Sequence, residues 1–287
     1  MTASAERVCL NCGVALTGRF CAQCGQRAVR AYPSVRELLG DAWHEFFGYD
    51  GRLLRTVTPL LTRPGALTVD AMEGRRARNV QPLRIYLAAS MMYFLIAATA
   101  PNIGRPDAVV PGEEEIRIDL SDPRGAAALT PEQLAQARRN VQDAPRFLKP
   151  LFERVIEDPA AFRARVVSAM PRLLFGLVPV FAGLLAIFYR RRPYTQHLIF
   201  GLHLHAVIFL ALAAGELAKF TGSLGVVIGV AVTAWTFLAW YGLTALRRAY
   251  GGGWWRTVAK AAGLLVLYLV VWIVAMAALM IWAVWLG

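Results

Sequence analysis

Long apolar segments alternate with short polar ones through the C-terminal two thirds of the chain. Five of these segments hold few charged residues, and they cover residues 83–100, 171–190, 198–217, 224–246 and 259–285. A helix rises about 1.5 Å per residue, so about 20 apolar residues cross the roughly 30 Å of hydrocarbon in a bilayer. The pattern predicts an all-α polytopic membrane protein with about five transmembrane helices.

Amphipathic segments precede the first span, within residues 31–82. The segment 34–37, Ser-Val-Arg-Glu, has the spacing of a capping box at a helix start. A second apolar stripe with flanking arginines covers residues 52–63, and we expect Thr68 to cap a short helix that ends at Gly74. These helices are expected to lie on the inner membrane surface, to pack on the transmembrane bundle, or to do both.

The segment 101–170 separates the first two spans and begins with acidic, Pro- and Gly-rich sequence. Amphipathic helical pieces are expected to follow it, with breaks at Pro145, Pro150 and Pro159. No set of residues in this segment suggests a site.

Basic residues gather at alternate ends of the apolar segments. If the spans alternate in direction, all these clusters lie on one side, and the positive-inside rule places that side in the cytoplasm. The N-terminus is therefore expected inside and the C-terminus outside, with the first cluster against anionic lipid headgroups. The clusters are Arg75, Arg76, Arg78 and Arg84 before the first span, Arg190, Arg191 and Arg192 before the third, and Arg247, Arg248, Arg256 and Lys260 before the fifth.

Composition agrees with this prediction. Hydrophobic residues make up 57% of the 287 residues, the mean hydropathy is +0.45 and the net charge is +12, whereas charged residues make up only 17%. Soluble domains contain about 25% charged residues. The composition therefore excludes an ordinary cytosolic enzyme, and the hydrophobicity excludes a disordered chain.

All four cysteines lie near the N-terminus, with the spacing C-x2-C-x8-C-x2-C: Cys9, Cys12, Cys21 and Cys24. Four thiolates in two such pairs close a tetrahedral shell around one zinc ion, with no open position for a substrate. A glycine after the second cysteine of each pair suits the positive φ of such a turn. The pattern predicts a structural zinc ribbon over residues 1–30. The alternatives are two disulfides, which a reducing cytosol disfavours, or a thioredoxin-type redox pair, which would need a strand–helix context.

Several strings around the first span are specific enough to suggest a family. They are the two Cys-x-x-Cys-Gly pairs, Phe46–Thr56, Leu60–Gly65, Glu73–Arg78 and Gln81–Leu87. This order resembles the bacterial membrane-protein family known as domain of unknown function 3667, over residues 8–95 and again at 194–205. The resemblance implies residence in a bacterial inner membrane, which would place residues 101–170 and the C-terminus in the periplasm. It implies no established activity.

His197, His203 and His205 form a polar group near the inner end of the third span. Intramembrane ionisable residues are often functional, but hydrogen bonding inside a packed bundle is the alternative. On a helix His197 and His205 are about 80° apart and His203 lies on the other side, so the three cannot bind one metal ion from this helix alone.

Span four carries Gly225 and Gly229, which permit a close helix contact, within the chain or between copies in a homo-oligomer. The cysteine region has few basic residues and one aromatic residue, so a nucleic-acid partner is not expected.

Motifs for nucleotide binding and for nucleophilic or metal-assisted hydrolysis do not occur, and His44-Glu45 lacks the second histidine of a zinc protease. An enzyme is therefore the weakest hypothesis. The stronger one is a membrane-anchored interaction or regulatory protein whose cytoplasmic zinc ribbon contacts a protein partner. The alternative is a small-solute or ion transporter or channel that uses the histidine group.

Overall fold

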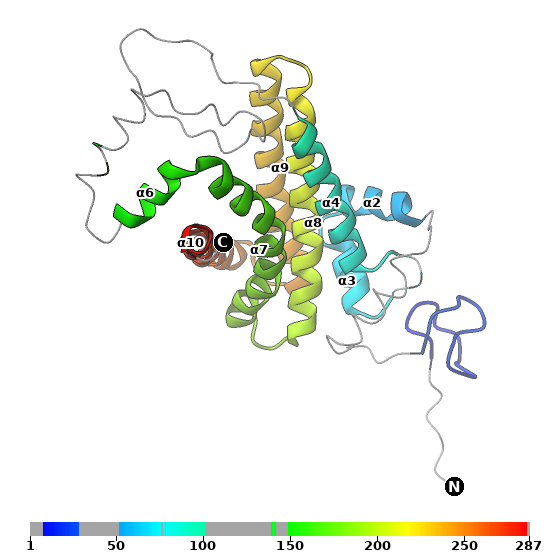
Figure 1. Cartoon of the computed structure of the whole chain (residues 1–287). Helices are drawn as coiled ribbons and strands as arrows, with labels where there is room; N and C mark the ends of the chain where they lie inside the picture. Colours follow the sequence, from blue (N-terminus) through cyan, green and yellow to red (C-terminus); the bar gives the residue numbers. More distant parts are fainter. Residues whose placement is uncertain are drawn as a thin grey trace. The chain divides into compact units, whose positions relative to one another are not determined.

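The structure is a computed structural model that describes residues 8–28, 52–75, 77, 79–100, 139, 141 and 149–285. In this part of the chain the only extended pairings are two isolated β-bridges, and all the elements are helices. Figure 1 shows them: α2 (Arg52–Thr62), α3 (Ala66–Met72), α4 (Pro82–Thr99), α6 (Lys149–Glu157), α7 (Pro159–Phe188), α8 (Tyr194–Lys219), α9 (Leu224–Tyr250) and α10 (Trp254–Trp285).

Five helices are long and apolar enough to cross a membrane: α4, α7 from Ala161, α8, α9 and α10. The prediction of an all-α protein with five candidate spans is therefore confirmed. Four of the helices extend beyond the predicted apolar segments, because polar residues at their ends continue the same helix. A 26-residue helix such as α8 is about 39 Å long, more than the roughly 30 Å of hydrocarbon that a span must cross.

The start of α7 differs from the expectation that the helical pieces of residues 101–170 are separate from the second span. Residues 159–170 are continuous with the apolar part of the helix. Pro159 is the first residue of α7 and Pro150 is the second residue of α6, which are positions where a missing N–H costs nothing. Pro145 and the segment 34–37 lie outside the described residues.

The chain divides into two compact units, Met1–Pro101 with Val178–Leu267, and Asn102–Leu177 with Tyr268–Gly287. In the first unit α4 packs along α8 and α8 packs along α9 (Figure 1). The rings of Tyr86 and Phe209 meet edge to face between α4 and α8, with centroids 5.7 Å apart. Among the described helices of this unit, α8 contributes the largest number of buried residues, including its three histidines.

The short helix α3 packs against α8 and α9. Its buried face consists of Leu67, Thr68, Ala71 and Met72. The preceding turn fits closely onto α9, since a Cβ on Gly65 would lie 2.9 Å from the backbone of Ala245. Helix α3 therefore packs on the bundle, which is one of the two arrangements expected for these helices.

The expected cap of this helix is wrong. Gly65, with φ +73°, occupies the N-cap position and no side chain caps the helix. Thr68 lies inside the helix, and its Oγ1 is 2.9 Å from Nδ1 of His203. The hydroxyl that we assigned to a local cap instead makes a buried contact with a residue 135 positions later.

Several connections of the first unit meet at one end of the bundle. Lys260 Nζ on α10 donates to the Phe188 carbonyl at the end of α7 (3.0 Å), and the rings of Tyr189 and Tyr250 stack with centroids 4.2 Å apart. Arg248, at the end of α9, donates from Nη1 to the Pro64 carbonyl between α2 and α3 (2.8 Å). The basic segments around residues 188–193 and 247–260 therefore share this end.

The second unit has its own core, between the N-terminal part of α7 and the C-terminal end of α10. Arg165 Nη1 donates to the Ala283 carbonyl beside this core (3.1 Å). The core residues are Phe162, Val166 and Ala169 from α7, and Leu279, Ala283 and Val284 from α10.

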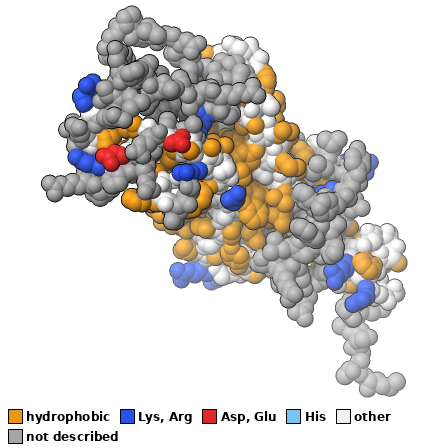
Figure 2. All heavy atoms as spheres, viewed as in Figure 1, with side chains coloured by type: hydrophobic (Ala, Val, Ile, Leu, Met, Phe, Trp, Pro, Cys, Tyr) orange, Lys and Arg blue, Asp and Glu red, His pale blue; other side chains and the backbone are white. Residues whose placement is uncertain are grey.

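Large apolar side chains point outward from α9 and α10. Trp235 on α9 is 66% exposed and Leu265 on α10 is 68% exposed. Figure 2 shows hydrophobic side chains over much of the visible helical surface. An apolar surface of this extent is far larger than soluble monomers expose and is what lipid-facing helices require.

Candidate metal centre

The four cysteines are held by two loops with the same backbone pattern, which we call the first knuckle (8–15) and the second knuckle (20–27). A β-bridge closes each knuckle, between Val8 and Ala15 and between Phe20 and Arg27. In each, the N–H of the first cysteine donates to the carbonyl five residues later, and the glycine four residues later returns a bond to the cysteine carbonyl. These bonds run from Cys9 to Val14 and Gly13 to Cys9, and from Cys21 to Gln26 and Gly25 to Cys21, at 2.8–2.9 Å.

Both glycines adopt the left-handed conformation that the sequence predicts. The φ angles are +77° at Gly13 and +70° at Gly25, and a Cβ at either position would meet nothing within 4 Å. Glycine is therefore required by the backbone conformation, which costs other residues about 1–2 kcal/mol, and not by a shortage of space.

The knuckles bring all four sulfurs together. The ligand atoms lie within 4.8 Å of one another, with Sγ of Cys9 3.6 Å from Sγ of Cys24, and Sγ of Cys12 3.5 Å from Sγ of Cys21. In a tetrahedral four-thiolate site with metal–sulfur bonds of about 2.3 Å, the sulfurs are about 3.8 Å apart. The arrangement therefore fits one metal ion.

These distances do not fit the disulfide alternative. A disulfide bond is about 2.05 Å long, and all four cysteines are free thiols here. The close pairs also join one knuckle to the other, whereas a redox Cys-x-x-Cys pair would join the two cysteines of one knuckle.

The electrostatic environment differs from one sulfur to the next. The backbone N–H groups of Cys24 and Gln23 lower the pKa of Cys21 to about 6. The N–H of Cys12 likewise lowers the pKa of Cys9. The N–H of Val14 acts to lower the pKa of Cys12, but burial and the three neighbouring sulfurs outweigh it and raise that pKa to about 12. The raised pKa of Cys12 opposes formation of its thiolate, and a bound metal ion would offset that effect by compensating the negative charge.

The second knuckle is attached to the segment that leads into α4. The side chain of Gln26 is buried and bonds the backbone on both sides: Nε2 donates to the Gly74 carbonyl (2.8 Å) and Oε1 accepts from the Ala77 N–H (3.1 Å). The Gln26 carbonyl is also the acceptor that closes the knuckle at Cys21. Gln26 therefore links the cysteine-containing loop to Ala77, which lies five residues before the start of α4.

Each histidine of α8 contacts a different neighbouring group. His197 Nδ1 is 2.8 Å from the Tyr250 hydroxyl, and His205 Nδ1 is 2.8 Å from the Gly201 carbonyl of its own helix. His203 meets Thr68 of α3. Within the described part of the chain the only group of three or more metal-ligating side chains is the cysteine cluster, so the structure does not bring the histidines together as a ligand set.

The predicted basic cluster is divided between different environments. Arg75 pairs with Asp70 (Nη2 to Oδ1, 2.6 Å) and with Glu73. Arg84 is half-buried on α4. Arg76 and Arg78 lie outside the described residues.

Gly225 and Gly229 are exposed on α9. A Cβ on Gly225 would meet only the hydroxyl of Ser223, at 3.8 Å, and one on Gly229 would meet nothing within 4 Å. Among the described residues no other helix covers these two positions, so a contact between copies stays a prediction.

The comparisons with known proteins bear on the helices next to this centre. Residues 50–94 match the family described as Protein of unknown function (DUF3667). The resemblance to DUF3667 is thus confirmed over α2, α3 and the part of α4 up to residue 94. Neither the curated proteins nor the solved structures include a match to the chain.

The DUF3667 match includes the features that sequence reasoning missed. Gly65, Thr68 and Gly74 lie inside it, and each makes a close contact with a distant part of the chain. The Pro64-Gly65 turn was a visible signal, but nothing in the local pattern says that Thr68 would face α8 or that Gln26 would reach Gly74. The cysteine knuckles lie outside the matched residues.

Proposed function

We propose that this DUF3667-like chain is a membrane-anchored interaction protein, in which a zinc-bound ribbon docks a protein partner beside the bilayer. The observation that carries the proposal is the attachment of the ribbon through Gln26 to the segment before α4. That attachment leaves two apolar side chains of the first knuckle, Val8 and Val14, 54% and 41% exposed. An ordered apolar surface on so small a module is typical of a binding site for a protein.

Zinc is the metal that the donor set supports best. Four sulfur donors in tetrahedral spacing suit zinc or an iron–sulfur centre. A single zinc ion would order a ribbon of this size, which cannot build a core from its own apolar residues. All four positions are then filled by protein, so the site is structural.

The ribbon is proposed to face the cytosol of a bacterial cell, with the C-terminus in the periplasm. The support is the gathering of Arg190–Arg192, Arg247, Arg248 and Lys260 at the end of the first unit where Lys260 meets Phe188. Basic residues at one end of a bundle favour the cytoplasmic side. A reducing compartment also keeps thiols free to bind metal.

The test is photocrosslinking in intact cells with a photoreactive residue in place of Val14. The expected result is one discrete crosslinked protein, which disappears when Cys9→Ser and Cys12→Ser remove the metal site. The matched control places the same residue at Phe220, which is exposed at the other end of α8. A crosslink that survives loss of the cysteines, or that forms equally at Phe220, would contradict the proposal.

A proton or ion pathway along α8 is the second candidate. One observation favours it: Nε2 of His197 is buried and has no hydrogen-bond partner among the described residues. Proton flux into liposomes, followed with a pH-sensitive dye, tests this function. Loss of flux in His197→Ala, with an unchanged melting temperature, would support the proton or ion pathway. Equal flux in the wild-type protein and in His197→Ala would contradict it.

A further inference from the structure

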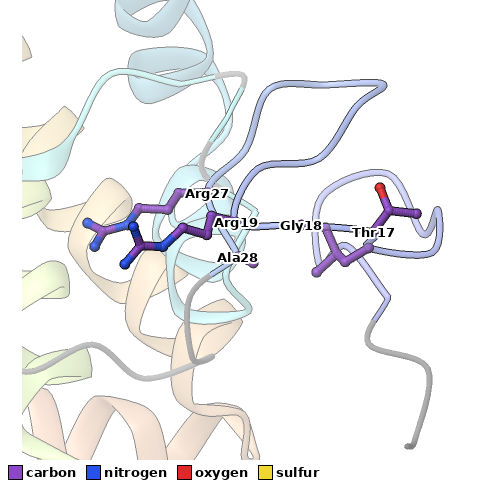
Figure 3. Close-up of a pocket in the computed structure, with 6 residues that line it drawn as sticks. Thr17, Gly18, Arg19, Arg27 and Ala28 are labelled. Atoms are coloured by element: carbon purple, nitrogen blue, oxygen red, sulfur yellow. The ribbon is translucent and has the colours of Figure 1, made fainter.

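The segment between the two knuckles and the end of the second knuckle line a cavity that the cysteine site does not use. Its volume is about 480 Å³, and Leu16, Thr17, Gly18, Arg19, Arg27 and Ala28 line it. Figure 3 shows the side chains of Arg19 and Arg27 extending in the same direction, next to each other, while Thr17 lies apart from them. Two guanidinium groups therefore share one side of this cavity.

The backbone brings these arginines together. The N–H of Ala28 donates to the Arg19 carbonyl (2.8 Å), and Arg27 forms the β-bridge with Phe20. A regular antiparallel pair would send Arg19 and Arg27 to opposite faces. Here the pairing is a single bridge, and both long side chains turn to the same side.

This pair is suited to a phosphate group. Guanidinium groups bind phosphate oxygens through paired, charge-assisted hydrogen bonds, and two of them can contact one phosphate from neighbouring positions. The two arginines do not give the ribbon a net positive charge. A zinc ion with four thiolates would carry a charge of −2, and this balances the +2 of Arg19 and Arg27. Recognition would therefore depend on the local geometry of Arg19 and Arg27.

The attachment of the ribbon close in sequence to the first candidate span favours a lipid headgroup as the source of the phosphate. Gln26 lies next to Arg27 and holds the knuckle to Gly74 and Ala77, close in sequence to Pro82, where the first candidate span begins. Phe20, next to Arg19, is 61% exposed. Exposed aromatic rings beside arginines are common where proteins meet lipid headgroups.

We propose that Arg19 and Arg27 bind the phosphate of an anionic phospholipid headgroup, with Phe20 inserted beside it. The inference rests on the metal-ordered ribbon of the proposed function, but it requires no protein partner. It assigns Arg19, Phe20 and Arg27 to the lipid and leaves the first knuckle, with Val8 and Val14, to the protein.

The test measures hydrogen exchange of residues 16–28 in the full chain, reconstituted in nanodiscs. One sample contains phosphatidylcholine alone, and the other contains phosphatidylcholine and phosphatidylglycerol in equal amounts. Exchange of residues 16–28 is expected to be severalfold slower with phosphatidylglycerol. Arg19→Gln with Arg27→Gln should abolish this difference while the zinc content stays at one per chain.

Two further samples and one control variant identify the ligand. Inorganic phosphate or an acidic peptide, added to the phosphatidylcholine sample, should not slow exchange. The matched control, Arg190→Gln with Arg191→Gln, changes two exposed arginines outside the ribbon and should keep the lipid effect.

Equal exchange in the two lipids, or a lipid effect that survives loss of Arg19 and Arg27, would overturn the inference. Slower exchange with inorganic phosphate or with the acidic peptide alone would also overturn it, in favour of that ligand. A chain that lacks zinc in every sample would instead count against the proposed function, so the two failures are distinguishable.

Discussion

At the scale of single residues, a few polar groups hold distant segments together. The contact between Thr68 and His203 is buried on both sides and joins α3 to the middle of α8. A buried polar group that loses its partner costs about 1–3 kcal/mol. Contacts of this kind decide whether the amphipathic helices lie free on a membrane or stay attached to the bundle.

Replacing Thr68 with valine keeps the shape of the side chain and removes the hydroxyl. We expect the free energy of unfolding to fall by about 1–3 kcal/mol, because Nδ1 of His203 is left buried without its partner. Thr62→Val is the matched control, since the hydroxyl of Thr62 bonds the Thr58 carbonyl of its own helix at an exposed position. Melting temperatures in detergent measure both. Equal shifts in the two variants would show that the buried contact contributes nothing.

At the scale of elements, the apolar pattern was sufficient for the helices but not for their contacts. Runs of apolar residues predicted all five candidate spans, and the stripe over residues 52–63 predicted α2. The short helix α3 was expected as well, but its cap was wrong, because Thr68 has the same local sequence whether it caps a helix or faces a histidine 135 residues away. The local sequence pattern cannot distinguish between these two roles of Thr68.

At the candidate metal centre too, the local structure could be predicted from the sequence and the tertiary contacts could not. Cysteine spacing and the following glycines predicted the knuckles, because the ligands and the turns are both local in sequence. The attachment through Gln26 depends on where α3 ends and α4 begins, so it follows from tertiary packing. The histidines were predicted as a polar group, and their separate partners on α3 and α9 required the assembled bundle.

Gln26→Ala should release the second knuckle from the segment before α4. The N–H of Ala77 would lose its acceptor, so its hydrogen exchange should become faster, while the metal content should not change. Gln23→Ala changes an exposed glutamine of the same knuckle and should leave exchange at Ala77 as it was. Slow exchange at Ala77 in both variants would mean that the attachment is not formed in solution.

At the scale of the whole molecule, crossing of the bilayer by all five candidate helices would place the two ends of the chain on opposite sides. The basic residues predict a cytoplasmic N-terminus. A phosphatase reporter that is active only in the periplasm should therefore be active when fused after Gly287 and inactive when fused before Met1. The reverse result would place the ribbon in an oxidising compartment, where disulfides would compete with metal binding.

The metal content of the purified chain tests the account most directly. In this account the order of the ribbon, its attachment to the segment before α4 and both of its proposed surfaces depend on a filled four-cysteine site. The account predicts one zinc ion per chain, lost in Cys21→Ser and retained in Gln23→Ala. A chain that purifies without metal, or with its four cysteines joined in disulfides, would contradict it.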